Sequence, residues 1–260
     1  MKLSFAHLLK RLPARQRQTP ALVAPAPDTP FVAIGDVHGR ADLLRELDRI
    51  IEAHHPGWPV VTLGDYIDRG ARSREVLELL MSASTGSDAP AICLMGNHER
   101  MLLDFLDDPA PNAAQWLNNG GLQCLTSFSV ALPPHGAADP ATLKALRDRL
   151  ATAMGEDMIA WLRARPLSWR SGNVWAVHAG ADPATAMSRQ PPEVLLWGHP
   201  AFRHRPRRDG QWVVHGHRIV DAPGMCDGRI ALDTGAYATG QLSAAAIAAE
   251  AITFWQTGEA

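Results

Sequence analysis

Three short motifs of this chain place polar side chains directly after apolar, strand-like runs. They are GDVHG at residues 35–39, GDYIDRG at residues 64–70 and GNHER at residues 96–100. Two further strand-like runs end in histidines, His178 in VWAVHAG and His215 in WVVHGH. Carboxylate, amide and imidazole groups without a thiolate suit manganese, iron or zinc. The five strand ends together therefore predict a hydrolytic centre with two divalent metal ions.

The spacing within the motifs indicates how the ligands divide between two cations. Asp36 and His38 are two residues apart, so at a strand end both can face one side and chelate one metal. Asp65 can place one oxygen on each cation, and Asn97 offers a neutral carbonyl oxygen. Cations about 3.5–4 Å apart hold a shared hydroxide and clamp a phosphate for in-line attack. The expected ligands of manganese, or equally of iron or zinc, are Asp36, His38, Asp65, Asn97, His178 and His215.

Three neighbouring residues suit the remaining steps of phosphate hydrolysis. His98 can protonate a leaving oxygen as a general acid, and Asp68 can orient and stabilise it. Arg69 presents a planar fork of donors to phosphate oxygens. Each residue alone has a plainer interpretation: Asp68 and Arg69 as a surface ion pair, His178 as a core histidine. The occurrence of all the motifs in order, each after a strand-like run, favours the catalytic interpretation.

Several histidines lie outside these motifs. We expect them to be structural or solvated, and the HGH context makes His217 the first exception to consider. They are His54, His55, His135, His204 and His217.

The first hundred residues alternate between strand and helix patterns. Apolar runs at Phe31–Ile34, Pro59–Leu63 and Ala91–Met95 predict strands. Apolar residues at helical spacing predict helices at Ala41–His54 and Arg74–Met81. This alternation predicts a parallel sheet covered by helices. Ligands bind beyond the carboxyl ends of such strands, where the three motifs lie.

The rest of the chain divides into a helical and a β-rich part. Residues 101–165 are expected to form a helical cap beside the site, with helices at Thr142–Met154 and Glu156–Arg163. From Leu167 onward the pattern is β-like, and the turn at Arg170–Gly172 predicts a hairpin. The following strands are expected in QWVVHGH, RIALDTGA and QLSAAAIAA, so the second half is predicted to be a more antiparallel sheet.

Composition limits the class of protein. The 260 residues, 46% of them hydrophobic, suffice for one sizeable core, and the net charge of −2 gives no field for nucleic acid or membrane. Three cysteines without a C-x-x-C pattern support neither a disulfide framework nor a zinc knuckle, so we expect a cytoplasmic protein. No apolar run reaches the ~20 residues of a membrane span. Residues 1–29 are expected to be a loosely ordered basic and Pro/Ala-rich tail with one short helix near Leu3–Leu12, before a catalytic domain at 30–260.

The motif set resembles the phosphoprotein phosphatase family, in its small prokaryotic serine/threonine branch of the calcineurin-like metallophosphoesterases. The Gly-Asn-His-Glu sequence of the third motif favours this family over the wider phosphodiesterases. The resemblance runs from about Phe31 to Ile247. Further matching segments are WLNNGGLQCL at 116–125, LLW at 195–197, VVHGH at 213–217 and DTGAYATG at 233–240.

This resemblance implies a fold, a site and a reaction. The fold is a four-layer α/β/β/α sandwich of two mixed sheets flanked by helices, with the metals at one edge. The first metal is held by Asp36, His38 and Asp65. The second metal is held by Asp65, Asn97, His178 and His215. The reaction is direct attack by water without a phosphoenzyme, with His98 and Asp68 as the acid pair.

The sequence departs from the family at the second phosphate-binding arginine, which usually follows LLW closely. Here Gly198, His199 and Pro200 follow, and the first arginine is Arg203, at the start of the basic loop RHRPRR. We therefore expect Arg69, Asn97 and Arg203 at the substrate phosphate, with His199 as the alternative to Arg203.

Three functions are weighed on this basis. The favoured one is a protein phosphatase acting on phosphoserine, phosphothreonine and also phosphotyrosine, so its partner is a phosphorylated protein or a small phosphoester. The alternative is a dinucleoside polyphosphate hydrolase, similar to diadenosine tetraphosphatase, in which Trp116 or Phe128 of the cap stacks on a base. The third is a non-catalytic scaffold that binds phosphorylated partners. The intact His98, Asp68 and Arg69 argue against the third.

Overall fold

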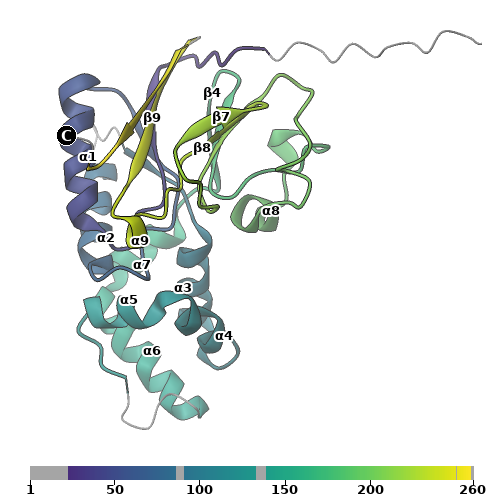
Figure 1. Ribbon diagram of the computed structural model, residues 1–260. Helices are drawn as coiled ribbons and strands as arrows, with labels where there is room; N and C mark the ends of the chain where they lie inside the picture. The colour runs from purple at the N-terminus through teal and green to yellow at the C-terminus, as the bar shows by residue number, and fades with distance from the viewer. Residues whose placement is uncertain (1–22, 86–90, 133–138, 250, 259–260) are drawn as a thin grey trace, which may run out of the picture.

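Two five-stranded sheets pack face to face, with helices on the outside (Figure 1). The computed structural model describes residues 23–85, 91–132, 139–249 and 251–258. The first sheet has the order β10-β9-β1-β2-β3. Its strands are β1 (Phe31–Ile34), β2 (Val60–Thr62), β3 (Ala91–Cys93), β9 (Ser243–Ala248) and β10 (Ala251–Gln256). The second has the order β4-β5-β6-β8-β7. Its strands are β4 (Ser168–Ser171), β5 (Val174–Val177), β6 (Trp212–His215), β7 (Gly224–Cys226) and β8 (Arg229–Ala231).

Alternation along β1 explains how both faces of the first sheet become buried. Phe31 and Ala33 face the second sheet, where they meet β5, β6 and β8 in one apolar cluster. Val32 and Ile34 face the other way, onto α1 (Ala41–His54) and α2 (Ser73–Ser84). Side chains two residues apart share a face of a strand, so a fully apolar four-residue run serves two cores.

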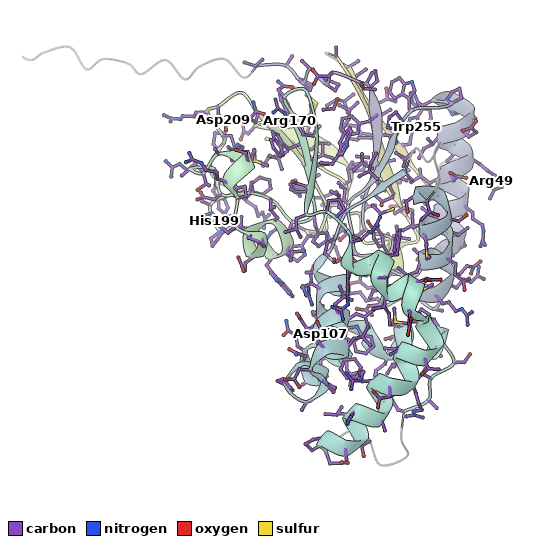
Figure 2. The ribbon with its side chains drawn as sticks, turned by 180° about the vertical axis from the view of Figure 1, so that it is seen from behind. Arg49, Asp107, Arg170, His199, Asp209 and Trp255 are labelled. Atoms are coloured by element: carbon purple, nitrogen blue, oxygen red, sulfur yellow. The ribbon has the colours of Figure 1, made fainter. Side chains whose placement is uncertain are left out.

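Helix α1 covers the first sheet with a single apolar stripe. Leu43, Leu44, Leu47 and Ile51 are buried, and the helix ends at His54 before Pro56, as the periodicity predicts. Figure 2 shows Arg49 of this helix and His199 on opposite outer sides of the sandwich.

The predicted helical cap is present and begins within the third motif. Helix α3 starts at Asn97 itself, so the GNHER motif is a strand-to-helix turn. These helices extend below the sandwich in Figure 1, where Asp107 lies at the end of α3 (Figure 2). The segment comprises α3 (Asn97–Asp107), α4 (Pro109–Trp116), η1 (Leu117–Gly121), α5 (Leu122–Ser127), α6 (Pro140–Met154) and α7 (Glu156–Arg163).

The second sheet is more parallel than predicted. The hairpin of β4 and β5 is antiparallel, but β5 pairs with β6, and β6 with β8, in parallel. The long connection between β5 and β6 makes parallel pairing possible, because it carries η2 (Met187–Arg189) and α8 (Pro192–Trp197) across the sheet. The strand predicted in QLSAAAIAA, β9, joins the first sheet beside β1 instead, just after α9 (Ala236–Thr239).

The last residues of the predicted tail bind the second sheet. Ala26 exchanges hydrogen bonds with Asn173, and the Trp212 indole donates to the carbonyl of Val23 at 2.7 Å. Residues 23–29 are thus held against the β4–β5 turn. The helix expected near Leu3–Leu12 lies outside the described residues, among which no helix is long and apolar enough to cross a membrane.

A substitution at Gly64 can test how closely the second and third motif loops approach each other. Its φ is +100°, and a Cβ there would lie 2.5 Å from the Gly96 nitrogen. We expect Gly64→Ala to lower the free energy of unfolding by at least about 2 kcal/mol, measured by urea denaturation. Gly57 is the matched control, because its φ is +73° but a Cβ there would meet no atom within 4 Å. Gly57→Ala should cost about 1 kcal/mol, and equal losses in the two variants would contradict the close approach.

Candidate metal centre and active site

The three motifs meet at the carboxyl ends of β1, β2 and β3. Backbone hydrogen bonds join the first two loops: the amides of Val37 and His38 both donate to the Asp65 carbonyl. Glu99 joins the second loop to the third, since its buried carboxylate accepts from the amides of Asp65, Tyr66 and Gly96 at 2.8 to 3.0 Å. Parallel strands with these turns therefore bring residues 36, 65 and 97 to one edge of the sheet.

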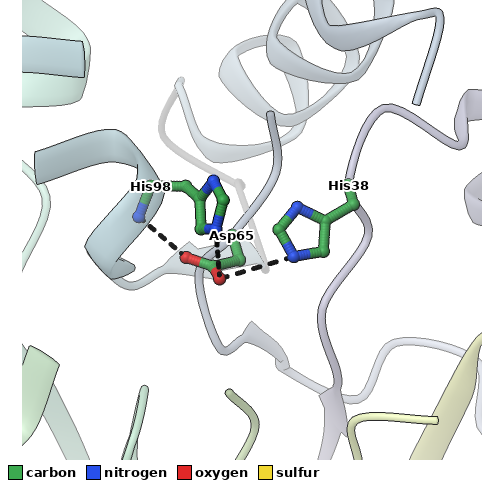
Figure 3. A group of neighbouring side chains, drawn as sticks. All are labelled: His38, Asp65 and His98. Atoms are coloured by element: carbon green, nitrogen blue, oxygen red, sulfur yellow. Dashed lines mark hydrogen bonds and ion pairs between the residues drawn. The ribbon is translucent and has the colours of Figure 1, made fainter. Parts of the chain in front are cut away.

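Asp65 lies at the centre of the site, between two groups of imidazoles. Its Oδ2 lies 3.5 Å from His38 Nε2 and 3.8 Å from His98 Nε2 (Figure 3). Its Oδ1 lies 3.3 Å from His178 Nε2. Two sets of donor atoms close enough for a metal ion result: His38, Asp65 and His98, and Asp65, His178 and His217. Each set takes a different oxygen of Asp65.

The ring orientations of two histidines fit a cation. His38 Nδ1 donates to the Ile67 carbonyl at 2.7 Å, and His178 Nδ1 donates to the Leu63 carbonyl at 2.9 Å. Each backbone bond fixes the proton on Nδ1, so each Nε2 carries a bare lone pair. These lone pairs face oxygen atoms, since His178 Nε2 lies 2.8 Å from Asn97 Oδ1. The lone pairs of these nitrogen and oxygen atoms repel each other, and a cation bound between them would be coordinated by both.

Burial keeps these imidazoles neutral, as metal ligands must be. It lowers the pKa of His38 to about 3 and the pKa of His217 to about 4, and it also lowers the pKa of His178. Lone pairs are therefore available at neutral pH.

Asp36 lies beside this centre, in a pair with Asp233. The His217 amide donates to both Asp36 oxygens, at 3.1 and 2.9 Å. Burial, then the neighbouring Asp233 and Asp65 carboxylates, raise the pKa of Asp36 well above its usual value. Burial likewise raises the pKa of Asp233 to about 6. Divalent cations would favour the charged form of such crowded carboxylates.

His98 and Asp68 form the pair that the sequence predicts. His98 Nδ1 lies 2.7 Å from Asp68 Oδ2, which directs Nε2 toward Asp65. Burial disfavours a charged His98, but Asp65 and Asp68 outweigh it and raise its pKa. The Trp116 indole donates to the second Asp68 oxygen at 3.1 Å, so this fully buried ring positions the pair. Trp116 is therefore not a free stacking surface, and Phe128 is buried as well.

Arg69 is positioned by the cap and by Tyr237. Its amide donates to the Gly120 carbonyl at 3.3 Å, and its guanidinium lies 4.7 Å from the centre of the Tyr237 ring. At Gly120 the φ is +106°, and a Cβ would lie 2.6 Å from the Arg69 nitrogen. The WLNNGG segment thus supplies two contacts to the second motif, one from Trp116 and one from Gly120.

Backbone strain concentrates at this site. Four non-glycine residues of the first two motifs have left-handed φ values between 43° and 69°: His38, Asp65, Asp68 and Arg69. This conformation is rare for such residues and persists where the surroundings enforce it, commonly at functional sites.

Comparison with known proteins identifies the family. Residues 29–221 match the calcineurin-like phosphoesterase family. The chain belongs to that family. The two mixed sheets flanked by helices are its metallophosphoesterase fold, and the family implies divalent metal ions and phosphoester hydrolysis.

Individual relatives differ in their named activities. The chain is 30% identical over 161 residues to a symmetrical bis(5'-nucleosyl)-tetraphosphatase of Methylococcus capsulatus, covering 60% of this chain and 46% of that protein. It is 38% identical over 71 residues to serine/threonine-protein phosphatase PP1-1 of Saccharomyces cerevisiae, covering 27% of this chain and 23% of that protein. The chain spans half or less of the curated relatives it matches.

Solved structures share the fold over almost the whole chain. A protein provisionally named diadenosine tetraphosphatase gives a TM-score of 0.61 at 20% identity, covering 92% of this chain and 98% of that one. The cold-active protein-tyrosine phosphatase of Shewanella sp. gives 0.55 at 18% identity, covering 90% and 82%. These identities support a common fold alone.

Within this metallophosphoesterase, the geometry favours a different histidine of HGH from the one predicted as a ligand. The His215 ring donates to the Gly216 carbonyl and packs edge-on to Phe202, outside both donor sets. His217 takes its place, with Nδ1 2.9 Å from Asn97 Oδ1. Strand β6 ends at His215, and Gly216 lets the chain turn: a Cβ there would lie 1.9 Å from Asp36 Oδ1. In the sequence, the only indication of a role for His217 is its position in the HGH tripeptide beside His215.

The structure also distinguishes between Arg203 and His199, the two residues proposed for the second phosphate contact. Arg203 lines the same open cavity as Arg69 and His217. His199 does not line it, and its Nδ1 accepts from the Ala201 amide. Three residues with clear roles in the geometry had no assigned role in the sequence analysis: Asp233, Tyr237 and Glu99.

Metal content should distinguish the two histidines of HGH. We expect His217→Ala to lose at least about half of the bound metal, because one donor set loses an imidazole. His215→Ala is the matched control and should retain it, since its ring lies outside both sets. Elemental analysis of purified protein loaded with Mn²⁺ would measure both. Loss of metal in His215→Ala and retention in His217→Ala would show that His215, and not His217, is the metal ligand.

Proposed function

We propose that this protein is a metal-dependent phosphomonoesterase that removes phosphate from serine, threonine and tyrosine side chains of proteins. The observation that supports it best is the His98–Asp68 pair, locked by Trp116 next to Asp65. A serine or threonine alkoxide is a poor leaving group and needs a proton as the P–O bond breaks. A fixed imidazole with its Nε2 facing the reacting centre meets that need.

The metal ligands form part of the same proposal. His38 and Asp65, with the neighbouring Asp36, would hold one cation, and Asp65, Asn97, His178 and His217 the other. His98 also lies within reach of the first cation, and we assign it to proton transfer instead. We favour Mn²⁺, and iron or zinc suits the same oxygen and nitrogen donors. When bound, two such ions supply a hydroxide at neutral pH and offset the charge of the phosphate.

The protein's own groups perform the remaining tasks. The Arg69 guanidinium offers paired donors to the phosphate oxygens, and Tyr237 and the Gly120 carbonyl fix its position. Arg203, on the rim of the same cavity, is the proposed second arginine contact. Asn97 would use its Oδ1, which lies between His178 and His217, for the metal, and its Nδ2 amide would donate to the phosphate.

A dinucleoside polyphosphate hydrolase is the second candidate. The Methylococcus capsulatus relative and four arginines in the cavity lining support it. Against it, the leaving group would be a nucleoside phosphate, which departs readily and gains little from a general acid. The cap residues expected to stack on a base, Trp116 and Phe128, are also buried.

Parallel assays would separate the two candidates. We would measure hydrolysis of a phosphothreonine peptide and of diadenosine tetraphosphate by the same protein with Mn²⁺, and again after chelation. A higher kcat/KM for the peptide, lost on chelation, supports the protein phosphatase. A higher value for the dinucleotide overturns it in favour of nucleotide hydrolysis.

The general acid can be tested through the leaving group. We expect His98→Asn to lower kcat on a phosphothreonine peptide by about 10²- to 10⁴-fold. The loss on p-nitrophenyl phosphate should be much smaller, because its phenolate needs little protonation. His54→Asn at the exposed end of α1 is a control that should change neither rate. Equal losses on both substrates in His98→Asn would contradict the acid role.

A further inference from the structure

One open cavity runs from the catalytic residues toward the edge of the second sheet. It has a volume of ≈ 720 Å³ and begins at Arg69, His217 and Tyr237. It ends at β7, where Gly224, Met225 and Cys226 all contribute to the lining. We call it the cationic groove and define it by Arg69, Arg203, Arg218, Arg229, Met225 and Tyr237.

The charge of the groove has one sign. Four arginines line it, and no aspartate or glutamate of the described residues does. The acids nearest in sequence, Asp221 and Asp227, are exposed but are not part of the lining. The chain as a whole carries a net charge of −2, so this positive charge is a local concentration. Such a surface attracts an anionic partner and repels a basic one.

These arginines exceed what a single phosphate group needs. Arg69 and Arg203 suffice for the scissile phosphate beside two metal ions. Arg229 donates to the Phe202 carbonyl at 2.8 Å and forms an ion pair with the exposed Asp227 at 3.2 Å, so its position is fixed and Asp227 offsets part of its charge. Arg218 is exposed, and its guanidinium forms no ion pair among the described residues. The last two can meet a second anionic group of the substrate.

The far end of the groove suits an extended chain. Strand β7 is the terminal strand of its sheet and, among the residues the structure describes, pairs with β8 alone, so its other edge presents backbone groups without a strand partner there. Extended peptides commonly add to such edges. Met225 and Ile219 are 53% and 54% exposed there and offer apolar contact. Of the described aromatic residues, Tyr237, the buried Phe202 and the imidazoles of His215 and His217 line the groove. The Arg69 guanidinium lies over the Tyr237 ring, which disfavours stacking of a nucleobase there.

We propose that the cationic groove binds an acidic, extended segment of a protein substrate on one side of its phosphorylated residue. Arg218 and Arg229 contact the acidic side chains while the segment lies along β7. This inference rests on the proposed protein phosphatase activity and adds a preference among phosphorylated sites. It also predicts that the preference weakens as ionic strength rises, since exposed charges are screened.

The test compares three phosphothreonine peptides of equal length. One carries glutamates on the N-terminal side, one carries glutamates on the C-terminal side, and one carries glutamines on both. We expect kcat/KM for one of the acidic peptides to exceed that of the glutamine peptide by about tenfold at low salt. Arg218→Gln and Met225→Glu should each reduce that ratio by about threefold or more.

Arg205 provides the matched control, because it is an exposed arginine of the basic loop outside the groove lining. Arg205→Gln removes the same charge and should leave the ratio at its wild-type value. Equal rates on all three peptides, or a ratio that Arg205→Gln lowers as much as Arg218→Gln, would overturn the groove assignment but not the phosphatase.

Two further outcomes concern the activity itself. If p-nitrophenyl phosphate is hydrolysed but none of the peptides is, the proposed protein phosphatase fails and the inference fails with it. If diadenosine tetraphosphate is cleaved faster than every peptide, and Arg218→Gln slows that cleavage, the groove binds polyphosphate instead of an acidic peptide.

Discussion

The buried carboxylate of Asp65 is the group on which the rest of the site depends. An ionised carboxylate inside a protein is costly unless charges or hydrogen bonds compensate it. Here the imidazoles of His38, His98 and His178 surround it, and the His98 amide donates to it at 3.0 Å. Further carboxylates lie close by, so the site concentrates negative charge that divalent cations can balance. The strained loops and buried glycines keep that arrangement in place.

The helical cap supports the residues of the second motif, and its described aromatic residues Trp116 and Phe128 are buried. Trp116 donates to Asp68, and the Gly120 carbonyl accepts from the Arg69 amide. Both contacts come from one short segment at the end of α4, where an irregular turn of helix allows close backbone approach. Asp68, which pairs with His98, and Arg69 are therefore positioned by the same part of the cap.

The metal site lies between the two sheets and draws residues from both. The first sheet supplies the motif loops that carry Asp36, Asp65 and Asn97. The second sheet supplies His178, His217 and the cationic groove along β7.

The sequence alone predicts the strand–helix order of the first hundred residues, the bounds of α1, and a site that joins His38, Asp65 and His178. The two donor sets of the structure contain His98 and His217 where Asp36 and His215 were expected. Apolar periodicity and motif spacing are local properties, so they can be recognised without a fold. Tertiary structure alone decided that His217 and not His215 joins Asn97, because the turn at Gly216 reverses the chain against Asp36. It also decided that β9 joins the first sheet, that Trp116 is buried against Asp68, and that Arg218 and β7 share one groove. Each of these features depends on which distant segments of the chain pack together, and the spacing of residues in the sequence does not determine that.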